Sequence, residues 1–389
     1  MAKIADAFSL IRNGANIKQG LDDSGYPITR IETISDRTVD RDKMGYAGIT
    51  DITKYSDYVL QDGDILMSHI NSETHLGKVA RYEKYEGETI IHGMNLLCLR
   101  PNKNLVDSRY AFYYLSSEAF LHQIPRITKK SVNQASFNVA ALKELTFPIS
   151  SMEVQQTVAD ILDKANELIA LRKEQLAKLD ELVKARFVEL FGDPISNPHG
   201  FDKVDLSELA DIKIGPFGSL LHKEDYIEGG YALLNPSHII DGKIAPDSKL
   251  TVSREKYEEL SAYRLKAGDV VMGRRGEMGR CAVVPCDGYL CGTGSLLIRT
   301  KGDVTADYIQ KIISFPSFKK AIEDMAVGQT MPNLNVPIVS SFQIIKPPIE
   351  VQHSYYAFVE QTDKSKVVVQ KALDEVQLLF DSLMQKYFE

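Results

Sequence analysis

The sequence predicts an α+β protein built from two tandem copies of one unit, in which a mixed α/β globule precedes a long helix. Three observations predict this fold. With 389 residues the chain is too long for one ordinary hydrophobic core. A long-period repeat runs through it, and a segment of helical pattern closes each half. The hydrophobic fraction of 44% and the charged fraction of 25% are ordinary for a soluble globular protein.

The repeat is visible as short matches that recur in the same order. In the first part of the unit they share one offset, since 268 minus 63 is 205. These matches are Ile4-Ala5-Asp6 with Leu209-Ala210-Asp211, Gly25-Tyr26 with Gly230-Tyr231, Ile34 with Ile239, Val39 with Ile244, and Gly63-Asp64 with Gly268-Asp269. The offset then falls to 199 for Arg100 and Arg299, 198 for Tyr110 and Tyr308 and for Phe120 and Phe318, and 197 for Val154-Gln155 and Val351-Gln352. Such a drift is what loop deletions produce in a duplicated unit, here of roughly 195 residues.

The first part of each unit, residues 1–150 and 193–345, is predicted to be a mixed α/β globule. Short apolar runs broken by Gly, Pro and Asp are typical of buried strands. Examples are Asp64-Ile65-Leu66-Met67, Asn95-Leu96-Leu97-Cys98-Leu99, Asp269-Val270-Val271-Met272 and Ser295-Leu296-Leu297-Ile298. Between them, Ser108–His122 and Ala306–Asp324 have helical patterns.

The second part of each unit, residues 151–192 and 346–389, is predicted to be a long helix. No Pro or Gly occurs from Met152 to Phe191, and Gly192-Asp193-Pro194 then gives a helix stop signal. The first helix has an apolar stripe of Val154, Val158, Ile161, Ala165, Leu168, Leu176, Leu179, Val183 and Leu190. The second has a heptad seam of Val369, Leu373, Val376, Phe380, Leu383 and Tyr387.

At 1.5 Å per residue each helix would be ~60 Å long and must bury its apolar stripe. We expect the two helices to pair with each other, antiparallel, as a coiled-coil spacer between the globules. The alternative, that each helix packs on its own globule, stays open.

The net charge of −7 bears on the class of partner. A protein that holds DNA alone usually carries a basic surplus, because neutralising phosphates supplies most non-specific affinity. The acidic balance therefore counts against autonomous DNA binding, but it is compatible with a local basic face and with partners that supply further contacts.

Metal chemistry and membrane insertion are not expected. Cys281, Cys286 and Cys291 recur every five residues, unlike the short spacing of a structural zinc site. The histidines considered as ligands, His69, His75, His222 and His238, are scattered over different loops. No secretory signal pattern and no run of 18 apolar residues occurs, so we expect a cytoplasmic protein.

The chain resembles the specificity (S) subunit of type I restriction–modification systems over essentially its whole length. The resemblance rests on the order and duplication of several segments rather than on one motif. These are L-x-x-G-D-I/V at Leu60–Ile65 and Leu265–Val270, Pro148–Gln155, Leu190-Phe191-Gly192-Asp193-Pro194, Gly215-Pro216-Phe217-Gly218-Ser219, Asn333-Leu334-Asn335, and Pro347-Pro348-Ile349-Glu350-Val351-Gln352.

The resemblance implies that residues 1–150 and 193–345 are target recognition domains and that the two helices dock methyltransferase subunits. The implied partners are double-stranded DNA, two methyltransferase subunits and, in the full complex, two restriction subunits that use ATP and Mg²⁺. S-adenosylmethionine would bind the methyltransferase, so no cofactor is expected on this chain. Two similar domains related by a pseudo-two-fold axis would read half-sites about one helical turn, ~34 Å, apart. Because the copies have diverged, the target should be asymmetric and bipartite, with the helices setting the length of the unread spacer.

The first candidate DNA-binding loop spans residues 126–138 and carries three cations and no acid. Amides and hydroxyls beside the cations can serve base edges and phosphates. Its candidate residues are Arg126, Lys129, Lys130, Ser131, Asn133, Gln134 and Ser136, and those of its counterpart in the second copy are Gln329, Thr330, Asn333 and Asn335. A solvated polar connection remains the alternative.

The second candidate loop follows the Gly-Asp strand. Arginines among glycines let the backbone approach a phosphate while guanidinium groups reach guanine or phosphate. The candidates are His69, Asn71 and Lys78 in the first copy and Arg274, Arg275 and Arg280 in the second. A weaker third candidate joins Ser219 and His222 with Asn235-Pro236-Ser237-His238, where local loop capping is an alternative.

The rival functional class is an enzyme, either a DNA methyltransferase or a nuclease. Asn235-Pro236-Ser237-His238 is the nearest approach to the N/D-P-P-F/Y motif of adenine methyltransferases, but it lacks the second proline and the aromatic residue. The sequence contains no G-x-x-x-x-G-K-[ST] loop and no G-x-S-x-G elbow. A nuclease motif of scattered acids, a coiled-coil scaffold whose globules bind protein, and a DNA-binding module of another phage-defence complex remain open.

Overall fold

The computed structural model describes residues 2–20, 24–34, 37–131, 134–217, 220–277, 279–326 and 333–389. The chain divides into two compact units, and both long helices contribute to each. Unit 1 consists of Met1–Gln175 with Val369–Glu389, and unit 2 of Leu176–Val368.

The central element of unit 1 is a four-stranded antiparallel sheet in the order β2-β6-β3-β5. Its strands are β2 (Phe8–Asn13), β6 (Leu96–Pro101), β3 (Ile65–Ser68) and β5 (Val79–Arg81). Shorter pairings join β1 (Ala2–Lys3) to β9 (Thr146–Phe147), and β4 (Ile70–Asn71) to β8 (Ala135–Ser136) and β7 (Lys129–Lys130). The helices are α1 (Ile4–Ala7), α2 (Ser108–Ser116), α3 (Glu118–Leu121), α4 (Ile124–Ile127) and α5 (Val139–Lys143).

Unit 2 contains the equivalent sheet in the order β11-β21-β18-β19. Its strands are β11 (Ala210–Ile214), β21 (Ser295–Thr300), β18 (Val270–Gly273) and β19 (Cys281–Val283). Further strands are β10 (Lys203–Asp205), β12 (Tyr226–Ile227), β13 (Tyr231–Leu234), β14 (Ile239–Ile240), β15 (Lys243–Ile244), β16 (Thr251–Val252), β17 (Arg264–Leu265), β20 (Tyr289–Cys291) and β22 (Gln343–Ile345). The helices are α7 (Leu206–Leu209), α8 (Arg254–Glu259), α9 (Ala306–Ile313), α10 (Pro316–Ala326) and α11 (Val336–Ser340).

The shared strand order explains the repeat in the sequence. In both sheets the first strand in the sequence (β2 or β11) pairs with the last (β6 or β21). That strand pairs with the Gly-Asp strand (β3 or β18), which also pairs with the outer strand β5 or β19. The predicted α+β fold of two tandem mixed units is confirmed, and the offset drifts because the connecting loops differ in length.

An ion pair with a buried carboxylate explains why Gly-Asp and Arg recur together. The Asp64 carboxylate accepts two hydrogen bonds of 2.7 Å from Arg100. The Asp269 carboxylate accepts bonds of 2.7 and 2.6 Å from Arg299. Each carboxylate also accepts a backbone N–H at the turn before its strand. The bidentate pair thus ties the Gly-Asp turn to the neighbouring strand.

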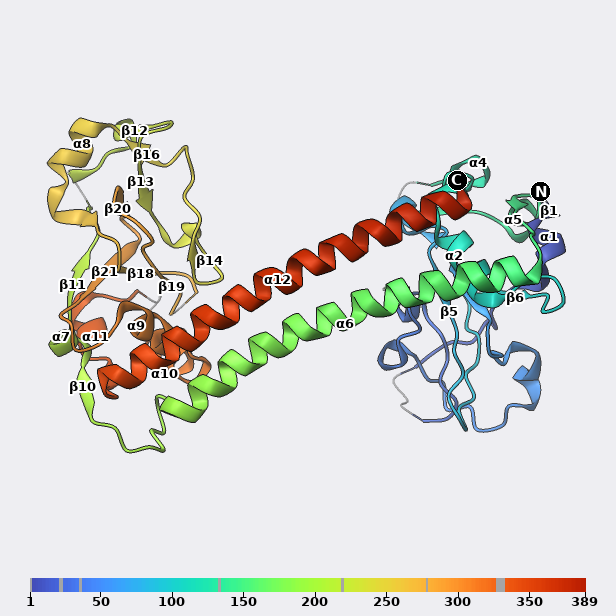
Figure 1. Ribbon diagram of the computed structural model, residues 1–389, viewed down its shortest axis with the longest axis horizontal. Helices are drawn as coiled ribbons and strands as arrows, with labels where there is room; N and C mark the ends of the chain where they lie inside the picture. The colour runs from blue at the N-terminus through green and yellow to red at the C-terminus, as the bar shows by residue number, and fades with distance from the viewer. Residues whose placement is uncertain are drawn as a thin grey trace. The chain divides into compact units, whose positions relative to one another are not determined.

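The two long helices are α6 (Met152–Phe191) and α12 (Ile349–Phe388), green and red in Figure 1. In unit 1 the beginning of α6 and the end of α12 share a core with the globule. In unit 2 the end of α6 and the beginning of α12 share one. Opposite ends meet within each unit, so the helical segments run antiparallel, and each also packs on a globule.

The buried side of α6 differs in part from the predicted stripe. Val154 and Leu168 are exposed, whereas Leu162 and Ile169 are buried. Because α6 packs against both α12 and a globule, its buried side differs from a stripe that faces a helix alone. On α12 all six positions of the predicted seam are buried or half-buried.

Candidate nucleic-acid interface

The two candidate loops of unit 1 lie side by side. Strand β8 (Ala135–Ser136) pairs on one side with β4 (Ile70–Asn71) and on the other with β7 (Lys129–Lys130). This small sheet joins the loop after the Gly-Asp strand to the loop at residues 126–138, which are about 60 residues apart in the sequence. The sequence alone predicted the two loops separately; the fold makes them one surface.

The cations of this surface differ in exposure and in ion pairing. Arg126, Lys129 and Gln134 are exposed. Lys130 is exposed but forms an ion pair of 2.9 Å with Glu73. Lys78 is half-buried. Because an exposed ion pair is worth little in water, Lys130 can exchange Glu73 for a phosphate at small cost.

The short polar side chains of the surface make local hydrogen bonds. Ser131 Oγ donates to the Gln134 carbonyl at 2.8 Å, and Asn71 Nδ2 donates to Ser68 Oγ at 3.3 Å. Ser136 is half-buried beside a hollow of about 340 Å³. These groups hold the loop in shape and leave Arg126 and Lys129 exposed to a polyanion.

His69 lies at the inner wall of that hollow. Its side chain is only 5% exposed, so it does not stand on the open surface. Burial lowers the pKa of His69 to about 4, and a hydrogen bond with the backbone of Asn95 acts in the opposite direction. The imidazole is therefore neutral at pH 7, and it lies edge-on to Phe137, with 6.3 Å between the ring centroids.

Unit 2 brings its candidate loops together in the same way. The Leu334 N–H donates to the Arg274 carbonyl at 2.9 Å, and Arg274 Nε donates to Asn333 Oδ1 at 3.1 Å. Asn335 accepts a hydrogen bond from the Ile338 N–H and caps α11. Asn335 thus has a structural role in addition to any contact with a ligand.

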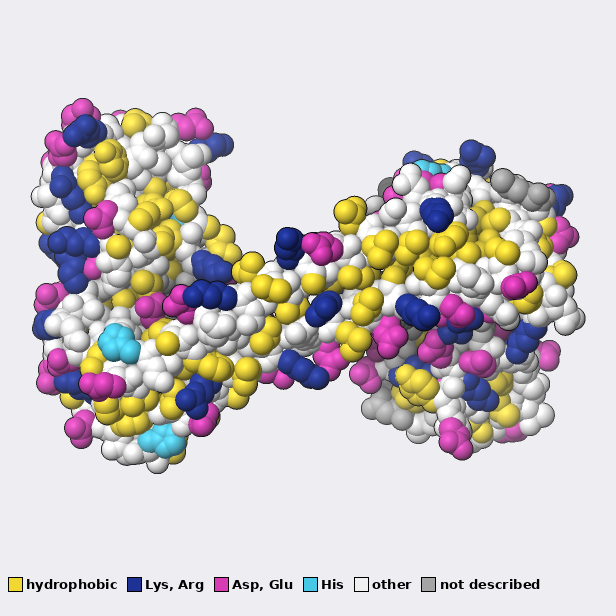
Figure 2. All heavy atoms as spheres, viewed as in Figure 1, with side chains coloured by type: hydrophobic (Ala, Val, Ile, Leu, Met, Phe, Trp, Pro, Cys, Tyr) yellow, Lys and Arg dark blue, Asp and Glu magenta, His cyan; other side chains and the backbone are white. Residues whose placement is uncertain are grey.

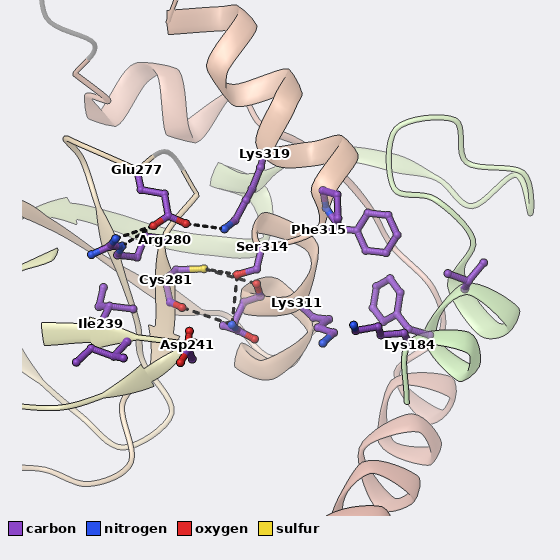
Figure 3. Close-up of a pocket in the computed structure, with 16 residues that line it drawn as sticks. Lys184, Ile239, Asp241, Glu277, Arg280, Cys281, Lys311, Ser314, Phe315 and Lys319 are labelled. Atoms are coloured by element: carbon purple, nitrogen blue, oxygen red, sulfur yellow. Dashed lines mark hydrogen bonds and ion pairs between the residues drawn. The ribbon is translucent and has the colours of Figure 1, made fainter. Parts of the chain in front are cut away.

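The remaining arginines of this loop differ in their surroundings. Arg275 is exposed. Arg280 forms an ion pair of 2.6 Å with Glu277, which also holds Lys319 at 3.1 Å, as Figure 3 shows. These three side chains line a hollow of about 700 Å³ that reaches α6 at Lys184. Because Glu277 offsets the charge of Arg280, Arg275 is more available than Arg280 for contact with a ligand.

Four predicted residues, Asn133, Ser219, Gln329 and Thr330, lie outside the described residues. The weaker third candidate adjoins the second loop, because Arg280 Nη1 donates to the Pro236 carbonyl at 3.3 Å. His238 is buried and His222 is not. Asn13, at the end of β2, lines the hollow beside His69 but was missed, because strand alternation does not single out the last residue of a strand.

The described residues contain no group of three or more His, Cys, Asp or Glu side chains that could hold a metal ion. Burial raises the pKa of the Cys281 and Cys291 thiols to about 12, so both stay protonated. Among the described residues of the two surfaces, no serine or cysteine side chain is hydrogen-bonded to a histidine side chain. Each offers cations, amides and hydroxyls around a hollow, which suits binding of a charged, hydrogen-bonding polymer.

Comparison with known families decides the identity. The sequence matches the type I restriction modification DNA specificity domain family twice, over residues 1–181 and 198–377. This chain belongs to that family. It is a type I specificity subunit, and its role is DNA sequence recognition. The two matches cover the two copies of the repeat.

Relatives of this specificity subunit include two proteins of Methanocaldococcus jannaschii. One, assigned as the specificity subunit of the type I restriction enzyme MjaX, is 31% identical over 96% of this chain and 89% of that protein. The other, the MjaIX specificity subunit, is 20% identical over 73% of this chain and 69% of that protein.

Solved structures support the fold of the specificity subunit. The S subunit of a type I system from M. genitalium is similar with a TM-score of 0.57 and 15% identity, covering 100% of this chain and 95% of that one. A chain from a structure on complex assembly and conformational transition of a type I system gives 0.61 and 14%, covering 100% and 97%. None of the described helices has the length and apolar character that crossing a membrane requires.

Proposed function

We propose that this subunit is non-catalytic and reads an asymmetric, bipartite DNA target, one half-site with each unit. The supporting observation is that the same two loops adjoin in both units while their contents differ. Lysines and a serine dominate in unit 1, and arginines in unit 2. A shared frame with different side chains suits reading two different half-sites.

The candidate contacts to DNA fall into two kinds. Exposed Arg126, Lys129 and Arg275 suit phosphates, which position the protein without reading sequence. Side chains held beside the hollows suit base edges. Lys130 and Arg280 would first have to leave, or share, their glutamates.

The long helices are proposed to dock two methyltransferase subunits. Large apolar side chains stay exposed on both helices, and Figure 2 shows hydrophobic side chains along them. They are Leu168, Leu171, Leu182 and Val188 on α6 and Val367, Val368, Leu378 and Leu379 on α12. Exposed apolar stripes on a helix mark a surface that a partner covers. In this proposal S-adenosylmethionine binds the methyltransferase, and two restriction subunits bring ATP and Mg²⁺ in the cytoplasm.

The experiment that tests bipartite reading is methylome sequencing of cells that express the chain with its methyltransferase. We expect one bipartite methylated motif. Exchanging residues 193–345 for those of a relative should change one half-site and keep the other. No bipartite motif, or a motif unchanged by the exchange, would contradict the proposal.

The spacing between half-sites tests the role of the helices. Inserting seven residues into both α6 and α12 adds ~10 Å of helix, about three base pairs. We expect the unread spacer to lengthen while both half-sites stay unchanged. Insertion into α6 alone serves as the control, since it breaks the register of the pair and should abolish methylation.

A further inference from the structure

His69 and Arg274 occupy the same position in the two copies of the unit. Each is the first residue after the Gly-Asp strand, following Ser68 in β3 and Gly273 in β18. Ser68 pairs with Leu96 of β6, and Gly273 pairs with Ser295 of β21, the equivalent strand.

A second backbone contact fixes the equivalence. The carbonyl of His69 accepts from the Phe137 N–H at 3.1 Å, and that of Arg274 accepts from the Leu334 N–H at 2.9 Å. Phe137 and Leu334 each precede the asparagine that caps the next helix, α5 or α11. Both units therefore hold this one side chain at the junction of the two candidate loops.

The two side chains at this junction have opposite hydrogen-bonding character. His69 is neutral, so only one of its ring nitrogens carries a hydrogen. That nitrogen is the donor in the hydrogen bond with the Asn95 backbone, an interaction that raises the pKa of the ring. The other nitrogen, Nδ1, is buried with no partner among the described residues. Nδ1 is then an unused acceptor, and leaving a buried acceptor unsatisfied is costly.

Arg274 can only donate. Its Nε is engaged with Asn333, while no hydrogen bond joins its two terminal nitrogens to any described residue. The side chain is half-buried, and this lowers its pKa from the ordinary value without removing the charge. Unit 2 thus holds free donors where unit 1 holds a free acceptor.

A hollow lies beside His69, whose Nδ1 is itself covered in the absence of a ligand. It measures about 340 Å³ and is also lined by Asn13, Lys129, Ser136 and Asn138. Pockets of this size admit small planar groups. Exposed Lys129 at its edge can hold a phosphate while a base edge enters.

We propose that His69 and Arg274 are the matched base-reading residues of the two units. His69 accepts a hydrogen bond from the exocyclic amino group of adenine or cytosine, and Arg274 donates to O6 and N7 of guanine. The inference rests on the proposed bipartite reading and adds which residue reads in each half-site and with which polarity.

The test uses the complex of this chain with its methyltransferase and duplexes that carry the motif found by methylome sequencing. His69→Leu should relax one position of the unit 1 half-site by about 10-fold or more and leave the other half-site unchanged. His69→Asn, which keeps an acceptor, should retain the preference. Arg274→Leu should relax one guanine position of the unit 2 half-site, and Arg274→Lys should retain it in part.

Base analogues separate reading from folding. Replacing adenine by purine, or cytosine by 2-pyrimidinone, at the relaxed position removes only the amino group. We expect wild-type affinity to fall by about 10-fold and the His69→Leu complex to be indifferent. At the relaxed guanine, 7-deazaguanine should weaken wild type and not Arg274→Leu.

His92 provides the matched structural control. It is as buried as His69, but its Nε2 is hydrogen-bonded to the Leu96 carbonyl at 3.0 Å. His92→Leu should lower the melting temperature and leave the motif unchanged. A bipartite motif whose unit 1 half-site tolerates amino removal at every position, or equal analogue penalties in wild type and His69→Leu, would overturn this inference alone. Absence of a bipartite motif would instead overturn the proposed function. If His69→Leu does not fold, the analogue series on wild type still decides.

Discussion

Asp64 and Asp269 hold the same structural position in the two units, at the start of the strand that carries the base-reading junction. Each is almost fully buried and bonded to an arginine of the neighbouring strand. Gly63 and Gly268 precede them with φ of 86° in both units, a conformation that favours glycine. A buried carboxylate at this position is tolerated only while the arginine that pairs with it is present.

At this scale we predict that Asp64→Asn destabilises unit 1 by about 3 kcal/mol, because it leaves the half-buried Arg100 guanidinium without its counter-charge. Urea unfolding followed by circular dichroism measures the change. Asp211→Asn is the control, since Asp211 is 78% exposed and 3.6 Å from Lys301, and it should change stability by less than about 0.5 kcal/mol. Equal effects of the two substitutions would show that burial of the pair does not matter.

A second contact that recurs in both units is made by a buried glutamine, which joins the start of each long helix to its globule. Gln155 Oε1 accepts from the Asp107 N–H at 3.0 Å, and Gln352 Oε1 accepts from the Thr305 N–H at 3.0 Å. Both glutamines are fully buried. Each amide fixes the first turn of α6 or α12 to the N-terminus of α2 or α9, so the helix leaves its globule in a fixed direction.

At the element scale we predict that Leu378→Glu with Leu379→Glu abolishes co-purification with the methyltransferase. These side chains are 72% and 53% exposed, so stability should change by less than about 1 kcal/mol in total. Size-exclusion chromatography of the co-expressed proteins measures assembly. Gln385→Glu, which adds one acid at another exposed position of α12, is the control and should leave assembly intact. Normal assembly of the double variant would place the methyltransferase elsewhere.

For the whole molecule, the net charge of −7 sets how it meets DNA. The candidate loops carry exposed cations, but the acidic surplus of the chain as a whole repels the polymer. Affinity must then depend on local contacts and on the partner subunits.

We therefore predict that the isolated chain binds target DNA at least about 10-fold more weakly than its complex with the methyltransferase. Affinity of the complex should fall by about 10³-fold between 50 and 200 mM salt, as for six phosphate contacts. Fluorescence anisotropy titrations measure both. Lys129→Ala should reduce the salt slope by about one without changing the motif, whereas equal affinity of the chain and its complex would contradict the charge argument.

The sequence by itself determined the duplication, the α+β class, the two long helices and the resemblance that the family match then bore out, because periodicity and repeated motifs are local properties. It also singled out the loops, since cations and glycines cluster in them. Only the tertiary structure decided that the loops adjoin in each unit, that His69 is buried with a free acceptor, and that Arg274 is its equivalent. Those facts arise from pairings between strands distant in the chain, and burial is set by everything that packs around a residue. For the same reason the buried side of α6 could not be read from its stripe alone: it faces a globule as well as a helix.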